Sequence, residues 1–181
     1  GIDNGSDATT TDLAFTARGT YAPIVEDRQV VHLGVSGSYR TFDDNSGPRI
    51  RLRTFHNGTR FVDTGVTVAE GQTTFGAEAA VAFGPFSAQG EYYTSTLEGN
   101  GAGAADTDLS GWYAMASYFV TGEHRTYDTA KGVFGRVKGE GAIELAARYE
   151  MIDMEDAGFG TAASETTAYT LGINYYFNPY V

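Results

Sequence analysis

Hydrophobic and polar residues alternate along most of the chain, in segments of about ten residues separated by Gly, Asp, Asn and Ser. In residues 13–22 the odd positions carry Leu13, Phe15 and Tyr21, and the even positions include Arg18. The same alternation recurs in residues 30–42, 73–84, 142–154 and 166–178. Alternation with a period of two is typical of half-buried β-strands, and a helical periodicity is hard to find.

Three further segments complete the predicted strands. In residues 87–97, Gln89 and Glu91 oppose Ala88 and Tyr92. Residues 109–121 are largely apolar on both parities, so their faces stay unassigned, and residues 49–56 are added as another strand. The pattern therefore predicts an all-β, antiparallel fold of about eight strands, joined by connections that are alternately short and long.

The residue types on the two faces indicate which solvent each face meets. A soluble antiparallel sandwich also alternates, so alternation alone does not decide. Here the apolar set is rich in Tyr, Phe, Leu and Ala, and the opposite set mixes small residues with Arg, Glu, His and Asn, as in outer-membrane barrels with a wet interior. A closed barrel also leaves no strand edge unpaired in hydrocarbon. We therefore expect a transmembrane β-barrel. Several aromatic residues near predicted strand ends suit its interfacial girdles: Tyr21, Tyr39, Phe83, Tyr169 and Phe177.

Composition narrows the function. The 181 residues include 12 basic and 23 acidic side chains, a net charge of -11, which disfavours nucleic acid as a partner. The absence of cysteine excludes a disulfide framework, a thiolate metal site and a thiol nucleophile. No apolar run approaches the 18 or so residues that a transmembrane helix needs. We expect residues 1–181 to form part of a single β-barrel domain, with 1–11 as an N-terminal extension or loop and 122–140 as a long basic connection.

Several strings, in order along the chain, resemble the phosphate-selective porin O and P family of Gram-negative outer membranes. They are FVDTG at 61–65, GPFSAQGEY at 84–92, GWY at 111–113, SYFVTGEHR at 117–125, GVFGRV at 132–137, GAIELAARY at 141–149 and TLGINYYFNP at 170–179. The resemblance implies homotrimers of 16-stranded barrels whose lumen carries an arginine ladder and selects anions such as phosphate or polyphosphate. The chain would then be about half a barrel, similar to the C-terminal part of the family chain, and a fragment of a longer protein.

The chain also departs from the family pattern. Ile143 and Tyr175 stand where Trp is usual, and Gly139 to Gly141 replace a turn that contains proline. Lysine is represented only by Lys131 and Lys138, whereas selectivity in the family is associated with a lysine cluster as well as the ladder.

Arginines on the polar parity are the candidates for an anion pathway. In an extended strand, Arg49, Arg51 and Arg53 point to one face at intervals of about 6.6 Å. A guanidinium is always charged and presents forked donors that match phosphate oxygens. Arg18, Arg40 and Arg148 are candidates for the same wall. The alternative is that these arginines pair with luminal acids and stiffen the barrel without selecting a solute; the acids are Glu78, Glu91, Glu144 and Glu150.

The connection 123–140 is the most basic in the chain. By resemblance to a connection that folds into the lumen of the family's pores, Arg125, Arg136 and Lys138 are constriction candidates; the alternative is a surface loop. Most acidic residues fall outside the predicted strands, where they either hold divalent cations near lipopolysaccharide or are solvated loop tips.

Catalysis has little support, because His32, His56 and His124 are scattered and no metal-binding spacing or nucleophile motif occurs. We therefore expect no enzyme activity, no cofactor and no metal site. The preferred hypothesis is a passive, anion-selective diffusion channel with small anions as solutes and with outer-membrane lipid and lipopolysaccharide as partners. Two alternatives stay open: a general or weakly cation-preferring porin, and a small closed eight-stranded barrel with a structural role.

Overall fold

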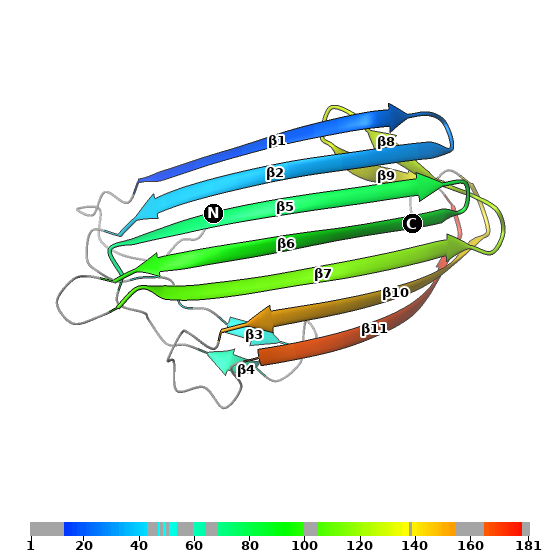
Figure 1. Ribbon diagram of the computed structural model, residues 1–181. Coiled ribbons are helices and arrows are strands. Elements are labelled where there is room, and N and C mark those ends of the chain that lie inside the picture. The colour runs from blue at the N-terminus through cyan, green and yellow to red at the C-terminus, as the bar shows by residue number, and fades with distance from the viewer. Residues whose placement is uncertain are drawn as a thin grey trace.

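A computed structural model describes residues 13–42, 47, 49, 51–53, 60–63, 69–99, 105–137, 139–154 and 165–178. These residues form antiparallel strands, which confirms the predicted all-β fold (Figure 1). Seven strands make one sheet in the order β1-β2-β5-β6-β7-β10-β11. Their bounds are Ala14–Val25 (β1), Gln29–Thr41 (β2), Gly71–Phe83 (β5), Phe86–Glu98 (β6), Thr107–Phe119 (β7), Ala142–Asp153 (β10) and Glu165–Tyr176 (β11). No helix among the described residues is long and apolar enough to cross a membrane.

Every pair of neighbours in the sheet is antiparallel, and most neighbours in space are also neighbours along the chain. Short turns join β1 to β2 and β5 to β6 at one end of the sheet, which we call the turn end (Figure 1). Gly84 in the second turn has a φ of 55°, a backbone conformation that residues other than glycine adopt only at an energetic cost. The longer connections from β2, β6 and β10 lie at the opposite end, the loop end. The connection from β7 to β10 is also long although it lies at the turn end, so the expected alternation of short and long connections holds only as far as β7.

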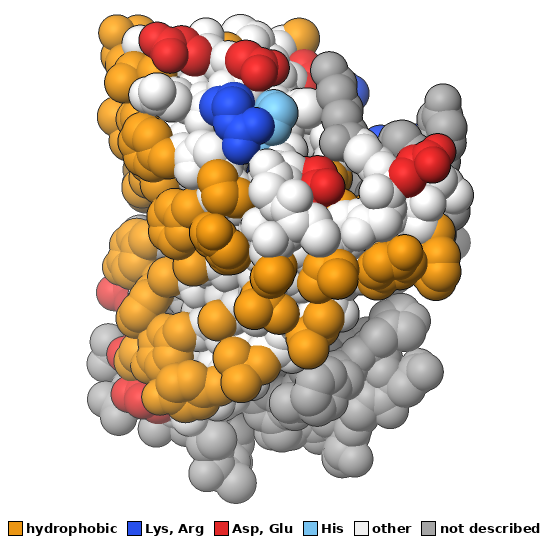
Figure 2. Space-filling model, turned by 90° about the vertical axis from the view of Figure 1, so that its right-hand side faces the viewer, with side chains coloured by type: hydrophobic (Ala, Val, Ile, Leu, Met, Phe, Trp, Pro, Cys, Tyr) orange, Lys and Arg blue, Asp and Glu red, His pale blue; other side chains and the backbone are white. Residues whose placement is uncertain are grey.

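One face of the sheet is apolar and exposed. Phe15, Leu171 and Ile173 are 72%, 85% and 77% exposed, whereas such side chains are buried when they belong to a hydrophobic core. Seen from the turn end, hydrophobic side chains run down one side of the molecule (Figure 2). Buried apolar residues gather instead in two small clusters, one around Phe42 and Leu97 and the other around Phe119. The apolar face of the sheet is therefore exposed and not packed against another layer of the protein, as predicted for a wall that faces lipid.

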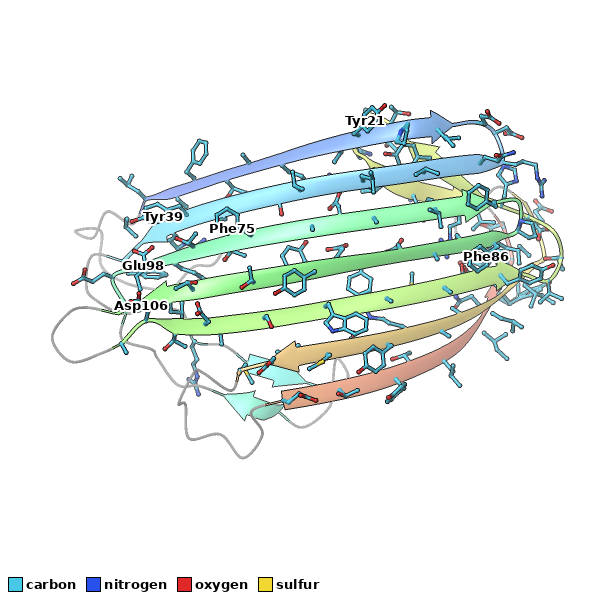
Figure 3. All side chains as sticks on the ribbon, in the orientation of Figure 1. Tyr21, Tyr39, Phe75, Phe86, Glu98 and Asp106 are labelled. Atoms are coloured by element: carbon cyan, nitrogen blue, oxygen red, sulfur yellow. The ribbon has the colours of Figure 1, made fainter. Side chains whose placement is uncertain are left out.

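Two rows of exposed aromatic residues cross the apolar face. Figure 3 shows Tyr39 and Phe75 toward the loop end of the sheet and Tyr21 and Phe86 toward the turn end. Along β5, Phe75 and Phe83 are eight positions apart, which corresponds to about 26 Å of extended chain. With the strand tilt of about 35–45° found in outer-membrane barrels, this length rises about 20 Å across the membrane, which fits within their apolar band of about 25 Å.

The strand whose faces the pattern left open is β7. Trp112 pairs across the sheet with Tyr92, and Tyr118 pairs with Phe86, so the even positions of β7 belong to the apolar face. Its odd positions, which include Tyr113, belong to the polar face with Glu91. Cross-strand partners therefore settle what the one-dimensional pattern could not.

The segment 49–56 does not form the additional strand of the wall that its pattern predicted. Within it, Arg51–Arg53 forms the short strand β3, which pairs with β4 (Arg60–Asp63) in a separate ladder. Residues 54–56 lie outside the described residues. The wall has no place for this segment between its sequence neighbours, because β2 pairs with β5 from Gln29 to Thr41.

The connection between β7 and β10 contains a second short ladder, formed by β8 (Arg125–Asp128) and β9 (Val133–Val137). We call this ladder and its turn the inner hairpin. In Figure 1 it lies behind the turn ends of β1 and β2, on the face opposite the aromatic rows. Among the described residues the large sheet is not closed, and β1 and β11 are its outer strands.

Candidate channel lining

The polar face of the sheet carries the ionisable side chains of the wall strands. Alternation places Arg18, Arg40 and Arg148 on this face, opposite the aromatic rows. Four glutamates share it, from β5, β6 and β10: Glu78, Glu91, Glu144 and Glu150. The strand pattern thus brings the predicted basic residues and their predicted acidic competitors onto one surface.

Arg18, Glu78 and His32 form the first charged cluster, across strands β1, β2 and β5. The Arg18 guanidinium makes a two-point ion pair with the Glu78 carboxylate, with Nε 3.2 Å from Oε2 and Nη2 bound to Oε1. His32 is 4% exposed, and its Nε2 lies 2.8 Å from the same carboxylate. Because a carboxylate only accepts hydrogen bonds, this nitrogen of His32 carries the proton.

The inner hairpin is bound to this cluster at its tip. Arg18 donates from Nη1 to the carbonyl oxygen of Lys131 at 2.9 Å and from Nη2 to that of Gly132 at 3.1 Å. The phenol of Tyr127 is hydrogen-bonded to His32, with its Oη 2.6 Å from Nδ1. Gly132 has a φ of 62°, which favours glycine in this tip.

Space at the hairpin tip is closely filled. A Cβ atom at Gly132 would lie 3.1 Å from Thr20 Oγ1 and 3.3 Å from His32 Cε1. On the sheet, a Cβ atom at Gly34 would collide with the side chain of Glu78. Glycines at these two positions therefore let the hairpin, the carboxylate and the sheet approach one another.

A second charged cluster fixes the base of the hairpin. Arg125, the first residue of β8, forms an ion pair with Glu144 of β10, whose side chain is fully buried. The Glu144 carboxylate also accepts from Tyr176 Oη at 2.6 Å and from Asn174 Nδ2 at 3.0 Å. Glu144 thus joins the hairpin to β10 and β11 through one desolvated carboxylate.

The third cluster lies in the middle of the polar face. Arg148 donates to Glu150 at 2.6 Å, and its guanidinium lies 3.7 Å from the centre of the Tyr113 ring. Glu91 accepts the hydroxyl hydrogen bonds of Tyr93 and Tyr113, each at 2.6 Å. Glu91 forms no ion pair with a described residue, and its hydrogen bonds come from these two phenols.

A cavity of about 350 Å³ separates the inner hairpin from the sheet. Its lining includes Arg18, Glu78 and Glu91 from the wall and Arg125 and Tyr127 from the hairpin. Two of these groups are cationic and two are anionic, so the cavity is polar without a large excess of either charge. No three His, Asp or Glu side chains of the described ranges are placed so that they could hold a metal ion.

Two ionisable groups of the inner hairpin, which lies outside the membrane-spanning strands, have shifted pKa values. Burial against the sheet raises the pKa of the Tyr127 phenol. The hydrogen bond from Lys131 Nζ, at 3.2 Å, and the backbone N–H groups of Lys131 and Ala130 hold the pKa of the Asp128 carboxyl below its usual value. The turn of the hairpin is therefore organised around an ionised Asp128 at neutral pH.

The remaining predicted residues are only partly placed. Arg40 is half-buried on β2, and Arg136 is exposed on β9; neither has an ion-pair partner among the described residues. Arg49 is exposed and precedes β3. Arg51 and Arg53 are placed as backbone in β3, and Lys138 lies outside the described residues.

Sequence reasoning did not single out His32, Tyr127 and Gly132 as contacts of the hairpin tip. His32 lay on the polar parity, which was a usable signal for its face, but its partner on β8 is 95 positions away along the chain. A positive φ at Gly132 has no signature beyond the glycine itself.

The profile of a family described as "Phosphate-selective porin O and P" matches residues 2–181. This chain belongs to that family. The resemblance drawn from the short strings is thereby confirmed, as is the bacterial outer membrane as its location.

Two relatives show how much of a porin of this family the chain covers. It is 34% identical over 194 residues to Porin O of Pseudomonas aeruginosa, a match that covers 91% of this chain and 44% of the relative. It is 33% identical over 153 residues to an uncharacterized protein of Caulobacter vibrioides, covering 78% of this chain and 30% of the relative. The chain thus spans less than half the length of both curated relatives.

Proposed function

We propose that this chain forms part of the wall of a water-filled porin channel through which small anions of the phosphate type diffuse passively across the outer membrane. The observation that carries the proposal is the division of the seven-stranded sheet into an exposed apolar face and a face that bears arginines, glutamates and the inner hairpin. The family membership supports the same function.

The open edges of the sheet support a larger barrel. In hydrocarbon, unpaired N–H and C=O groups along a strand cost several kcal/mol each. The outer strands β1 and β11 therefore need further partners, which the additional length of the relatives could supply. A small closed barrel would instead need β1 and β11 to pair with each other, and the described strands do not do so.

The proposed anion preference rests first on two arginines that form no ion pair with a described acid. Arg18, Arg125 and Arg148 are each ion-paired with a glutamate, so their attraction for a solute anion is reduced. Arg40 and Arg136 keep a positive charge that no described acid offsets. The series Arg49, Arg51 and Arg53 stays a proposed ladder, and Lys138 stays a proposed constriction residue.

A second candidate function is a general or weakly cation-preferring porin. The observation that favours it is Glu91, which lines the cavity, forms no ion pair with a described residue and accepts hydrogen bonds from two phenol groups. Under this alternative the luminal glutamates outweigh the arginines, and small cations pass more readily than anions.

Reversal potentials distinguish the two candidates. The full-length porin is inserted in a planar bilayer under a potassium chloride gradient, with phosphate added as a competitor. For an anion-selective channel, the sign of the potential reports anions, phosphate lowers the chloride conductance, and the triple change of Arg49, Arg51 and Arg53 to Ala moves the potential toward cations. Glu91→Gln is a single change of opposite sign, and it moves the potential toward anions. A wild-type potential of cationic sign would reject the first candidate in favour of the second.

A homotrimer and contacts with lipopolysaccharide are part of the same proposal. Loop-end acids such as Glu98 and Asp106 suit divalent cations that bridge to lipopolysaccharide phosphates (Figure 3). Chemical cross-linking of the native protein in outer membranes tests the trimer. Recovery of the monomer alone after cross-linking would reject it.

A further inference from the structure

The inner hairpin bridges a large part of the sheet. Its base is held at β10 by the ion pair of Arg125 with Glu144, and its tip is held at β1 by Arg18. In the sheet order, β1 and β10 are separated by β2, β5, β6 and β7, so five strand spacings, or about 24 Å along the sheet, lie between the two attachments. The hairpin therefore crosses the polar side of the wall and occupies space that a conduit would otherwise use.

The tip attachment uses nearly all the hydrogen-bonding capacity of Arg18. A guanidinium has five N–H donors in a planar fork. In Arg18, Nε binds Glu78, Nη1 binds the Lys131 carbonyl, and Nη2 is shared between Glu78 and the Gly132 carbonyl. An anion that bound Arg18 with a bidentate contact would have to displace either the carboxylate or the hairpin.

We propose that Arg18 is a positioning residue of the channel: it clasps the tip of the inner hairpin to the wall and thereby sets the width of the conduit, rather than binding the permeant ion. This inference rests on the proposed channel function, but it does not depend on the sign of the selectivity. Only the fork of an arginine spans one carboxylate and two carbonyl oxygens at once; a lysine carries the same charge on a single nitrogen.

The surroundings of the clasp are shaped for close approach. His32 is almost fully buried and links Glu78 of the wall to Tyr127 of the hairpin, so the carboxylate that orients Arg18 is itself held in place. Gly132 provides the space in which the tip meets Thr20. The clasp is thus one arrangement in which the wall and the hairpin each contribute backbone and side-chain groups.

Two variants separate positioning from charge. Arg18→Lys keeps the positive charge and loses the fork, whereas the pair Arg18→Gln with Glu78→Gln keeps the net charge of the wall and loses the clasp. Arg40→Gln is the control, because Arg40 lies on the same face without an ion-pair partner among the described residues. All variants are made in the full-length porin.

Two readouts follow the hairpin and the conduit. Spin labels on cysteines introduced at Asp27 and Ala130, in a sequence that has no cysteine here, report the distance between the turn end of the wall and the hairpin tip. Single-channel conductance in planar bilayers reports the conduit. We expect a narrow distance distribution in the unaltered channel, and a broadened distribution with a raised, fluctuating conductance in both Arg18 variants. Arg40→Gln should leave the label distances unchanged; it controls for the position of the hairpin alone, because Arg40 is itself a proposed residue of the anion pathway.

Several results would overturn the inference. If Arg18→Lys retains the conductance and the narrow distance distribution, the charge of Arg18 suffices and the clasp does not position the hairpin. A broad distribution in the otherwise unaltered labelled channel would also reject it, and this measurement needs no Arg18 variant to assemble. A cationic reversal potential, by contrast, would reject anion selectivity while leaving the clasp intact.

Discussion

The buried carboxylate of Glu144 offers the sharpest test of how this wall is held together. It accepts hydrogen bonds from Tyr176 and Asn174 and pairs with Arg125, and it is 0% exposed. Glu144→Gln keeps the shape of the side chain and removes its charge. The change leaves the Arg125 guanidinium without its carboxylate and sets the Gln amide against donors that need an acceptor.

The expected loss follows from burial. Removing one partner of a buried ion pair costs about 3–5 kcal/mol, because an uncompensated charge remains out of water. The Arg125 side chain is 22% exposed, so its guanidinium keeps some access to solvent. We therefore expect Glu144→Gln to lower the free energy of unfolding by a value at the lower end of that range, about 3 kcal/mol.

Glu150→Gln is the matched control on the same strand. Glu150 also pairs with an arginine, Arg148, but the two side chains are 39% and 35% exposed. Ion pairs in contact with water contribute less than about 1 kcal/mol. The two variants make the same chemical change, so the difference between them isolates the effect of burial.

The assay is urea unfolding of the full-length porin refolded into lipid vesicles, followed by tryptophan fluorescence. The double variant Glu144→Gln with Arg125→Gln should recover part of the loss, because both charges are then absent. Equal losses for Glu144→Gln and Glu150→Gln, or no recovery in the double variant, would refute the reasoning.

Three further predictions concern the inner hairpin and the apolar face. Gly132→Ala and Gly84→Ala both place a Cβ atom on a residue with positive φ, at a cost of about 1–2 kcal/mol. Only the Cβ atom at position 132 is crowded by the wall, so Gly132→Ala should displace the hairpin tip and raise the single-channel conductance. A rise in conductance with Gly84→Ala as well would argue against the tip contact. Leu171→Lys puts a charge on the lipid face and should lower the free energy of unfolding in urea by about 2–4 kcal/mol. Thr170→Lys, one position away on the polar face, should lower it by about 0.5 kcal/mol or less. Similar losses for the two variants would contradict the assignment of faces. The lysine ammonium and backbone N–H groups that lower the pKa of Asp128 stabilise the hairpin turn above the unfolded value of 3.8, and this stability is lost as the pH falls through the lowered pKa. The protection of the turn amides against hydrogen exchange, relative to the intrinsic exchange rate at each pH, should therefore fall only in that acidic range, and this pH dependence should be lost in Asp128→Asn.

The fold of the wall was largely predictable from alternation. A period of two has only two outcomes for each side chain, so Phe15, Leu33 and Ile173 are assigned to the apolar face as soon as the strand is recognised, and the structure exposes them there. The same reasoning could not assign the faces of β7. Tyr113 and Met115 on one face are partly apolar, and Trp112 and Tyr118 on the other face are apolar too. Its faces depended on neighbours in the sheet.

The segment that contains β3 shows the limit of the pattern in the other direction. Alternation of Arg51, Leu52 and Arg53 is correct for a strand, and β3 is a strand. Whether a strand belongs to the wall depends on its pairing partner, and the pairing of β2 with β5 assigns that place elsewhere. A local pattern carries no information about such a choice.

The sequence by itself determined which side chains face lipid and which face the polar side, because that division follows from residue type and strand period alone. Only the tertiary structure decided what the polar side chains do there. Arg18 and Arg148 were candidates for an anion pathway because of their strand face, and Arg125 because it lies in the basic connection. In the fold, each of the three forms an ion pair with a glutamate. Arg18 reaches a hairpin 113 positions away along the chain. Such pairings arise from the folding of the connection back across the sheet, and their geometry is fixed by long-range packing rather than by any spacing along the chain.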